Sequence, residues 1–252
     1  MIDKELVAKR FSKSIKSYDA NADAQRTIAE RMLAMISRHL KTENPKISEF
    51  GCGTGVYSKM LLKKLNPSSL WLNDICNDLK DYYAALDEPR IYFHAGDAES
   101  IEFPMMQDVI TGCSSIQWFN SQESFLDRIE NYLSEDGILA FSTFLPGNLH
   151  EIEGIMGKGL KYHSEEEYAS MLKDKYDILE FKSEDLELEF NSGLEVLKHL
   201  KATGVTGVRV KSWTPRVLNA FCEEYGRRYS KSDKVVLTYR PLYIIAKPIK
   251  NK

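Results

Sequence analysis

The sequence contains no run of about 18 apolar residues, so it predicts no membrane-spanning helix. Its first ten residues include acids and are followed by no apolar block, and we expect no secretory signal. Cysteine is sparse: Cys52, Cys76, Cys113 and Cys222 form no Cys-x-x-Cys pair, and no histidine stands near them at a metal-ligand spacing. These absences argue against a metal site and predict reduced thiols in a cytoplasmic protein.

A strong excess of charge of one sign is also lacking, since the formal net charge is -3, but the charges are unevenly spread. Residues 198–240 hold ten Lys and Arg against three acids, whereas residues 161–189 hold ten acids against four bases. A basic face within 198–240 would attract an acidic partner. Nucleic acid is disfavoured, because the segment has no long stripe of bases interleaved with aromatic residues.

Apolar periodicity predicts an α/β chain. At 252 residues with 43% hydrophobic content, one large core can be buried. Helix is predicted in residues 1–40, strands at 47–50, 69–73, 91–94, 108–112 and 138–143, and helices at 58–65, 77–86 and 123–133. Strands that alternate with helices imply right-handed crossovers and a mostly parallel sheet. The fold class is therefore a doubly wound α/β sheet.

The rhythm changes after Phe144, where several glycines interrupt the chain. Helices are predicted at 164–172, 194–203 and 215–229, and strand-like stretches at 176–190 and 234–247. The last helix has a clear start, because Thr214 can cap it and Pro215 suits the first helical position.

Three glycines at alternate positions, Gly51, Gly53 and Gly55, close the first predicted strand and open the first crossover helix. An α/β sheet binds its ligand at this place. A dinucleotide pyrophosphate needs Gly-x-Gly-x-x-Gly, and here the third glycine comes one residue early. S-adenosylmethionine has no phosphate, and its charged tail and sulfonium need open backbone near a carboxylate, which Glu49 would supply. The loop resembles motif I of class I methyltransferases, and we expect S-adenosylmethionine as the cofactor.

Acidic residues after the next two strands favour the same ligand. Asp74 follows the second strand, roughly twenty residues beyond the loop, where a carboxylate accepts ribose hydroxyls. Asp97 follows the third strand and would accept a hydrogen bond from the adenine amino group. Ile75 and Ala98, the next residues along the chain, are expected to bind the cofactor, as is Cys113 on the fourth strand.

Longer segments resemble the malonyl-acyl carrier protein O-methyltransferases, which open pimeloyl synthesis for biotin. They are residues 10–25, 116–118, 140–151, 197–208 and 237–239, and the similarity runs almost end to end. One departure is Gly112-Cys113, where related enzymes carry a bulkier, more polar pair. The resemblance implies a single domain with a seven-stranded sheet: a helical arm (1–42), a cofactor-binding half (43–146), and a substrate-binding half with a helical lid (147–252).

The resemblance also implies the reaction, which is methylation of the free carboxylate of malonyl-acyl carrier protein. A carboxylate is ionised at neutral pH, so no general base is expected, and catalysis rests on positioning and exclusion of water. An arginine fork suits such a carboxylate. Arg209 is the first candidate and Arg216 the second, although either could be a solvated surface residue. The carrier protein is expected to dock on the basic face within 198–240.

Four further residues are candidates for a lid over the methyl group. Tyr18 and Gln25 lie on the arm, and Gln117 and Trp118 follow the fourth strand. Tyr18 also continues an apolar helix stripe and could equally belong to the core. Two other functions remain open: a methyltransferase for another small carboxylic acid or quinone precursor, and a protein that binds S-adenosylmethionine without turnover.

Overall fold

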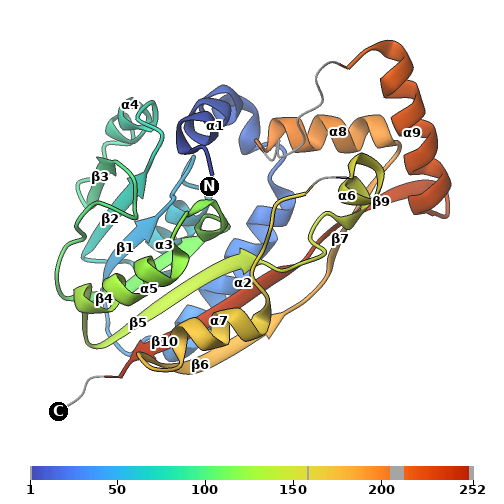
Figure 1. Cartoon of the computed structure of the whole chain (residues 1–252). Helices are drawn as coiled ribbons and strands as arrows, with labels where there is room; N and C mark the ends of the chain where they lie inside the picture. Colours follow the sequence, from blue (N-terminus) through green and yellow to red (C-terminus); the bar gives the residue numbers. More distant parts are fainter. Residues whose placement is uncertain (1, 158, 205–212, 250–252) are drawn as a thin grey trace.

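The computed structural model describes residues 2–157, 159–204 and 213–249 (Figure 1). The arm consists of two helices, α1 (Lys4–Tyr18) and α2 (Asp23–His39), as the apolar stripe predicted. The chain continues through β1 (Lys46–Phe50), α3 (Val56–Leu65), β2 (Ser69–Asp74), α4 (Leu79–Ala84), β3 (Ile91–Ala95), β4 (Gln107–Cys113), the 3₁₀ turn η1 (Ile116–Trp118), α5 (Gln122–Ile129), η2 (Glu130–Tyr132) and β5 (Leu133–Phe144). None of the helices within the described ranges is long and apolar enough to cross a bilayer.

A seven-stranded sheet in the order β3-β2-β1-β4-β5-β10-β6 forms the centre of the molecule. Strands β3, β2, β1, β4 and β5 run parallel to one another, whereas β10 (Pro241–Pro248) is antiparallel to both β5 and β6 (Tyr176–Ser183). The doubly wound, mostly parallel sheet predicted from the sequence is confirmed. The strand order reverses between β1 and β4, so the carboxyl ends of these two strands open the crevice in which such sheets bind ligands.

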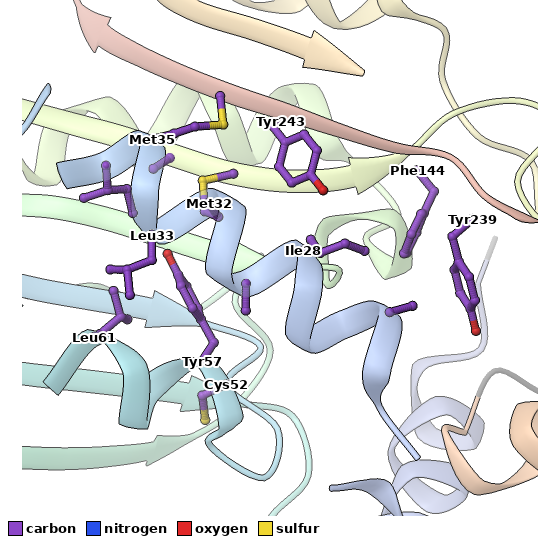
Figure 2. Close-up of a cluster of buried hydrophobic side chains, with 14 of the residues drawn as sticks. Ile28, Met32, Leu33, Met35, Cys52, Tyr57, Leu61, Phe144, Tyr239 and Tyr243 are labelled. Carbon is purple, nitrogen blue, oxygen red and sulfur yellow. The ribbon is translucent and has the colours of Figure 1, made fainter. Parts of the chain in front are cut away.

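Helices cover both faces of this sheet. Helix α2 packs against α3 and crosses β4, β5 and β10, and Figure 2 shows its apolar side chains, such as Met32, facing the core. Helices α5 and α7 (Glu165–Leu172) enclose a second cluster on the other face, around Phe125 and Phe141. Figure 1 shows α1 apart from these layers, above the strand ends where the crevice opens.

The C-terminal half adds a smaller unit beside the sheet. It comprises α6 (His150–Met156), β7 (Leu186–Phe190), α8 (Gly193–Ala202), α9 (Pro215–Tyr229), β8 (Ser230–Lys231) and β9 (Lys234–Tyr239), with β7, β9 and β8 forming a three-stranded sheet. The predicted start of α9 is confirmed, because the Thr214 hydroxyl accepts a hydrogen bond from the Val217 N–H at 3.3 Å.

Three details of the predicted secondary structure were wrong. The helix predicted at 123–133 ends at Ile129, because Leu133 already pairs with Gln107 at the start of β5. The strand-like stretches 176–190 and 234–247 each divide into two strands that belong to different sheets. Helix α6 was missed because Gly154 lies within it. A side chain on Gly154 would overlap the Tyr229 hydroxyl, so close packing explains the glycine.

Candidate active site

The glycine loop between β1 and α3 brings bare backbone to the crevice. Gly51, Gly53 and Gly55 all have positive φ, between +52° and +78°. A side chain on Gly51 would overlap Ser115, and one on Gly53 would meet the ring of Phe11 at 3.1 Å. Conformation and the close approach of neighbouring segments therefore both require glycine.

Asp74, at the end of β2, holds this loop in place. Its carboxylate oxygens accept hydrogen bonds from the backbone N–H groups of Gly53 at 2.9 Å and of Cys76 at 2.8 Å. Burial raises the pKa of Asp74 above its ordinary value, and these backbone hydrogen bonds oppose the rise. Each oxygen keeps a second lone pair, so the carboxylate can also accept hydrogen bonds from a ligand in the cavity.

Glu49, on β1, places a second carboxyl group behind the loop. It is only 2% exposed, and the Ser58 hydroxyl donates a hydrogen bond to it at 2.7 Å. Burial raises the pKa of Glu49 to about 8, the Ser58 hydrogen bond opposes the rise, and the charge of Asp74 adds to it. A cationic ligand nearby would favour the ionised form of Glu49.

The arm reaches the acid after the third strand through Lys4. The Lys4 ammonium lies 2.7 and 2.5 Å from the two carboxylate oxygens of Asp97, and it also pairs with Glu99. It lies 5.6 Å from the centre of the Phe119 ring. Asp97, which is predicted to accept a hydrogen bond from the adenine amino group, is thus paired with the arm in this conformation. An incoming adenine would compete with Lys4 for the same carboxylate.

The C-terminal end of α1 closes over the glycine loop. Tyr18 packs edge-on against Phe11, with ring centres 5.3 Å apart, and the Thr54 hydroxyl hydrogen-bonds to Asp19. Tyr18 lines the cavity, so the structure places it at the ligand space. Burial raises the pKa of Tyr18, and the charges of Asp19 and Asp74 add to the rise. Its phenol is therefore a hydrogen-bond donor at neutral pH.

The C-terminal half of the chain contributes neutral polar groups to the cavity wall, among them Asn148, Tyr162 and Tyr239. The Asn148 amide donates to the Tyr162 hydroxyl at 3.0 Å. His199 Nε2 lies 2.8 Å from the Tyr239 hydroxyl, and the Gln25 amide hydrogen-bonds to the same phenol. The sequence prediction missed Asn148, Tyr162 and Tyr239 as site residues. Asn148 and Tyr239 lie within segments that carry the family resemblance, and this was the available signal.

Three buried polar atoms in the cavity wall have no hydrogen-bond partner in the part of the chain that the structure describes: Gln25 Oε1, Ser114 Oγ and Gln117 Oε1. Ser114 also has a φ of +54°, which is uncommon for a residue other than glycine. Leaving a buried polar atom unpaired costs about 1–3 kcal/mol. The wall is therefore complementary to a ligand that supplies hydrogen bonds.

One cavity brings most of the predicted site residues together. They are Tyr18, Gln25, Glu49, Gly51, Gly53, Asp74, Ile75, Asp97, Ala98, Cys113, Gln117 and Trp118. Gly55 lies outside this wall, where it caps α3. The structure does not bring Arg216 to the cavity, because α9 presents that side chain to solvent. Arg209 lies outside the described residues, so its role in substrate binding stays a prediction.

The basic segment 198–240 is largely paired with acids. Its salt bridges are Arg227–Glu224, Arg228–Glu224, Lys231–Glu187, Lys234–Glu189 and Arg240–Asp185. Three of these join β7 and its flank to β9 and its flanks, which lie side by side in Figure 1. Lys198, Lys201 and Arg216 are exposed and form no salt bridge with any described residue. These three side chains are what the described segment leaves available to an acidic partner.

Comparison with known proteins places these features in context. A family model described as a methyltransferase domain matches residues 48–141. A malonyl-acyl-carrier protein O-methyltransferase of Bacteroides thetaiotaomicron is 43% identical over 259 residues, with 98% of each chain covered. The protein of the same name from Bacteroides helcogenes is 42% identical over 271 residues, covering 98% of this chain and 99% of that one.

A solved structure gives the same fold. The Haloferax volcanii putative methyltransferase, in complex with the Trm112 methyltransferase activator, superposes with a TM-score of 0.66 over 98% of this chain and 99% of that chain. Its sequence is only 15% identical, so the likeness concerns the fold alone.

Proposed function

Because the chain belongs to the malonyl-acyl-carrier protein O-methyltransferase family, we propose that it methylates the free carboxylate of malonyl-acyl carrier protein, the first step of pimeloyl synthesis for biotin. The observation that carries the proposal is that two sets of groups line one cavity. The first set, called the loop end, is the glycine loop with Glu49 and Asp74, whose backbone and carboxyl groups suit S-adenosylmethionine. The second set, called the far end, is Asn148, Tyr162 and Tyr239, whose neutral donors suit an anionic acceptor.

The residues at the loop end fit S-adenosylmethionine. Asp74 has lone pairs left for the ribose hydroxyls, and Glu49 can ionise beside the cationic tail of the ligand. The unpaired Ser114 Oγ and Gln117 Oε1 offer further hydrogen bonds. When bound, this cofactor supplies a methyl group that bonds to a carboxylate oxygen of the acceptor as the carbon–sulfur bond breaks and its electron pair passes to sulfur. Asp97 would accept a hydrogen bond from the adenine amino group once Lys4 no longer pairs with Asp97.

The remaining task of the protein is to hold the acceptor and to exclude water. An ionised carboxylate is already the nucleophile, so no side chain needs to remove a proton. Tyr18, Phe11 and the rest of α1 cover the cavity and would keep water from the nucleophile. Arginine recognition of the carboxylate by Arg209 stays a prediction from the sequence.

The docking surface for the carrier protein is proposed on α8. Lys198 and Lys201 are exposed there, and the helix ends beside the cavity wall at Thr203. Helix α1 packs against α8, where the Ser17 hydroxyl donates to the Ala202 carbonyl at 3.3 Å. A carrier protein bound to this face would therefore meet the cavity lid and the cavity mouth together. The proposed docking surface, α8 with Lys198 and Lys201, is therefore smaller than the basic face expected within 198–240.

Charge reversal tests the surface. Changing Lys198 and Lys201 together to Glu should raise KM for malonyl-acyl carrier protein about tenfold and leave KM for malonyl-coenzyme A unchanged. The matched control reverses Lys63 and Lys64 on α3. Equal KM values for the two double variants would remove the docking proposal.

The function itself is tested with isotopically labelled S-adenosylmethionine and three acceptors: malonyl-acyl carrier protein, malonyl-coenzyme A and free malonate. A base-labile ester on the carrier-bound acceptor supports the proposal. Label on none of them would favour a protein that binds S-adenosylmethionine without turnover, and equal label on all three would contradict carrier recognition.

We also propose the functional division of the chain into an arm (1–42), a cofactor half (43–146) and a substrate half (147–252). The cavity wall draws on all three segments. Strands β6 and β10 of the third segment complete the main sheet, so the division concerns binding roles within one domain. All four cysteines are free thiols, and a cytoplasmic location stays a prediction.

A further inference from the structure

Tyr239 stands at the meeting point of three segments at the far end of the cavity. It is the last residue of β9, two positions before β10 begins, and Figure 2 shows it beside Phe144 near the N-terminal end of α2. Its side chain is 1% exposed, and it belongs to the cavity wall, so it contacts the ligand space and not bulk water. His199 of α8, Gln25 of α2 and Thr203, which follows α8, all hydrogen-bond to this phenol.

The protonation states of His199 and Tyr239 leave the Tyr239 hydroxyl available as a hydrogen-bond donor. Burial lowers the pKa of His199, so its imidazole is neutral at neutral pH, while burial raises the pKa of Tyr239, so its phenol is protonated. When the imidazole proton is on Nε2, the phenol oxygen accepts from His199 and from the Gln25 amide. The Thr203 hydroxyl also interacts with this phenol and donates to the His199 carbonyl at 2.9 Å, so the Tyr239 O–H can donate either to Thr203 or to a ligand in the cavity.

The unpaired oxygen of Gln25 agrees with this orientation. Gln25 Oε1 has no partner among the described residues, so the contact with Tyr239 is made through the amide nitrogen. An amide that donates to the phenol oxygen directs the phenol proton away from Gln25. Tyr239 is therefore held by His199 and Gln25, and its proton can pass from Thr203 to a ligand.

Few cationic side chains line the cavity, so few could bind the acceptor carboxylate in place of Tyr239. Its cationic wall residues within the described ranges are Lys4 and Arg10, both from α1, and Lys4 is bound to Asp97. A neutral donor also suits the reaction, because it orients a carboxylate without cancelling the charge that makes it nucleophilic.

We infer that the Tyr239 hydroxyl donates a hydrogen bond to the acceptor carboxylate and sets its position for methylation, with His199 as the positioning residue behind it. The inference rests on the proposed function, since it names the group that recognises the acceptor of that reaction. It assigns recognition of the malonyl carboxylate to a tyrosine and not to an arginine.

The test compares Tyr239→Phe with Tyr225→Phe. Tyr225 is a buried tyrosine outside the cavity whose hydroxyl donates to the Val236 carbonyl at 2.7 Å, so both variants remove a buried phenol hydroxyl that is hydrogen-bonded within the protein. The Kd for malonyl-acyl carrier protein is measured with S-adenosylhomocysteine present, and the carrier lacking malonyl serves as the reference ligand. Tyr239→Phe should weaken binding of the malonyl form at least tenfold, leave the reference ligand unaffected, and leave the Kd for S-adenosylhomocysteine unchanged.

A second comparison uses variants of His199. His199→Gln keeps a side-chain donor and should retain most of the affinity for the malonyl form, whereas His199→Leu should approach Tyr239→Phe. A purely structural histidine would lower thermal stability in both variants without this split in affinity.

The outcomes separate this inference from the proposed function. If the wild-type protein methylates malonyl-acyl carrier protein but Tyr239→Phe binds it as the Tyr225→Phe control does, only the tyrosine assignment is overturned. Loss of affinity in Arg209→Met with none in Tyr239→Phe would overturn it in favour of an arginine fork. If the wild-type protein does not discriminate the malonyl form from the reference carrier, the function and the inference fail together.

Discussion

The backbone N–H of Gly53 donates a hydrogen bond to a carboxylate oxygen of Asp74 at 2.9 Å. This contact joins the glycine loop after β1 to the acid at the end of β2, two motifs that the sequence connects only by analogy with other folds. The acid thus has two tasks: it fixes the loop, and it presents its remaining lone pairs to the ligand.

Replacing this acid should disturb both tasks. Asp74→Asn places an amide where two backbone N–H groups now find acceptors, and we expect the Kd for S-adenosylhomocysteine to rise about 10- to 100-fold. Calorimetric titration measures it. Asp78→Asn, four residues further along the chain, is the matched control. A Kd within twofold of the control would show that Asp74 does not hold the ligand.

Cofactor affinity should depend on pH through Glu49. In the free protein burial raises the pKa of Glu49 to about 8, and a cationic ligand favours the ionised carboxylate, so binding below pH 8 must release a proton. We expect affinity to rise with pH by up to about tenfold per unit until it levels near pH 8. Titrations in two buffers of different ionisation enthalpy measure the released proton.

The Glu49→Gln variant is the control for the pH effect, because the ligand's own titration is then all that remains. Glu49 also links stability to pH. Its contribution to the folded state is fully present below the ordinary pKa of 4.5 and is lost as pH rises through about 8. An identical proton release in wild type and Glu49→Gln would refute the role of this carboxyl.

Removal of the Lys4 salt bridge should loosen the arm. Lys4→Met also removes the ion pair with Glu99, which stays available when the adenine takes Asp97. Such a pair is worth about 1 kcal/mol, so release of S-adenosylhomocysteine should become about fivefold faster. Stopped-flow displacement measures the rate. Lys9→Met, an exposed position on the same helix, should behave as wild type. If both variants release the ligand at the same rate, Lys4 does not hold the lid.

Gly112 on β4 should be intolerant of any side chain. A Cβ there would overlap the ring of Phe50 on the neighbouring strand, and such overpacking costs about 1–3 kcal/mol. Gly112→Ala should therefore lower the free energy of unfolding, and Phe50→Leu in the same chain should recover part of the loss. Urea unfolding of the two single variants and the double variant gives the coupling energy. Strict additivity would argue against the steric explanation.

The packing of Phe50 against Gly112 also explains the Gly112-Cys113 pair, which the sequence shows only as a departure from related enzymes. Gly112 makes room for Phe50, and Cys113 beside it lines the cavity. The alternation of strands and helices through β5 was predictable because its apolar periodicity is local. The glycine loop and Asp74 were predictable because their places in such a sheet are fixed by topology.

Other parts of the site depend on contacts between distant segments and could not be read from the sequence. The pairing of Lys4 with Asp97 requires the arm to fold back over β3. Tyr239 enters the wall because β9 ends against β10, a break that the continuous run of β formers conceals. The basic surface was overestimated for the same reason. The pairing of β7, β9 and β8 in one sheet brings Glu187 near Lys231, which a count of charges along the chain does not reveal.

The most direct test of the central claim is the intact mass of malonyl-acyl carrier protein after incubation with the protein and S-adenosylmethionine. The account predicts that the malonyl form gains the mass of one methylene group, that mild base reverses the gain, and that carrier protein without malonyl gains nothing. An unchanged mass of the malonyl form, under conditions in which the protein binds S-adenosylhomocysteine, would contradict the account.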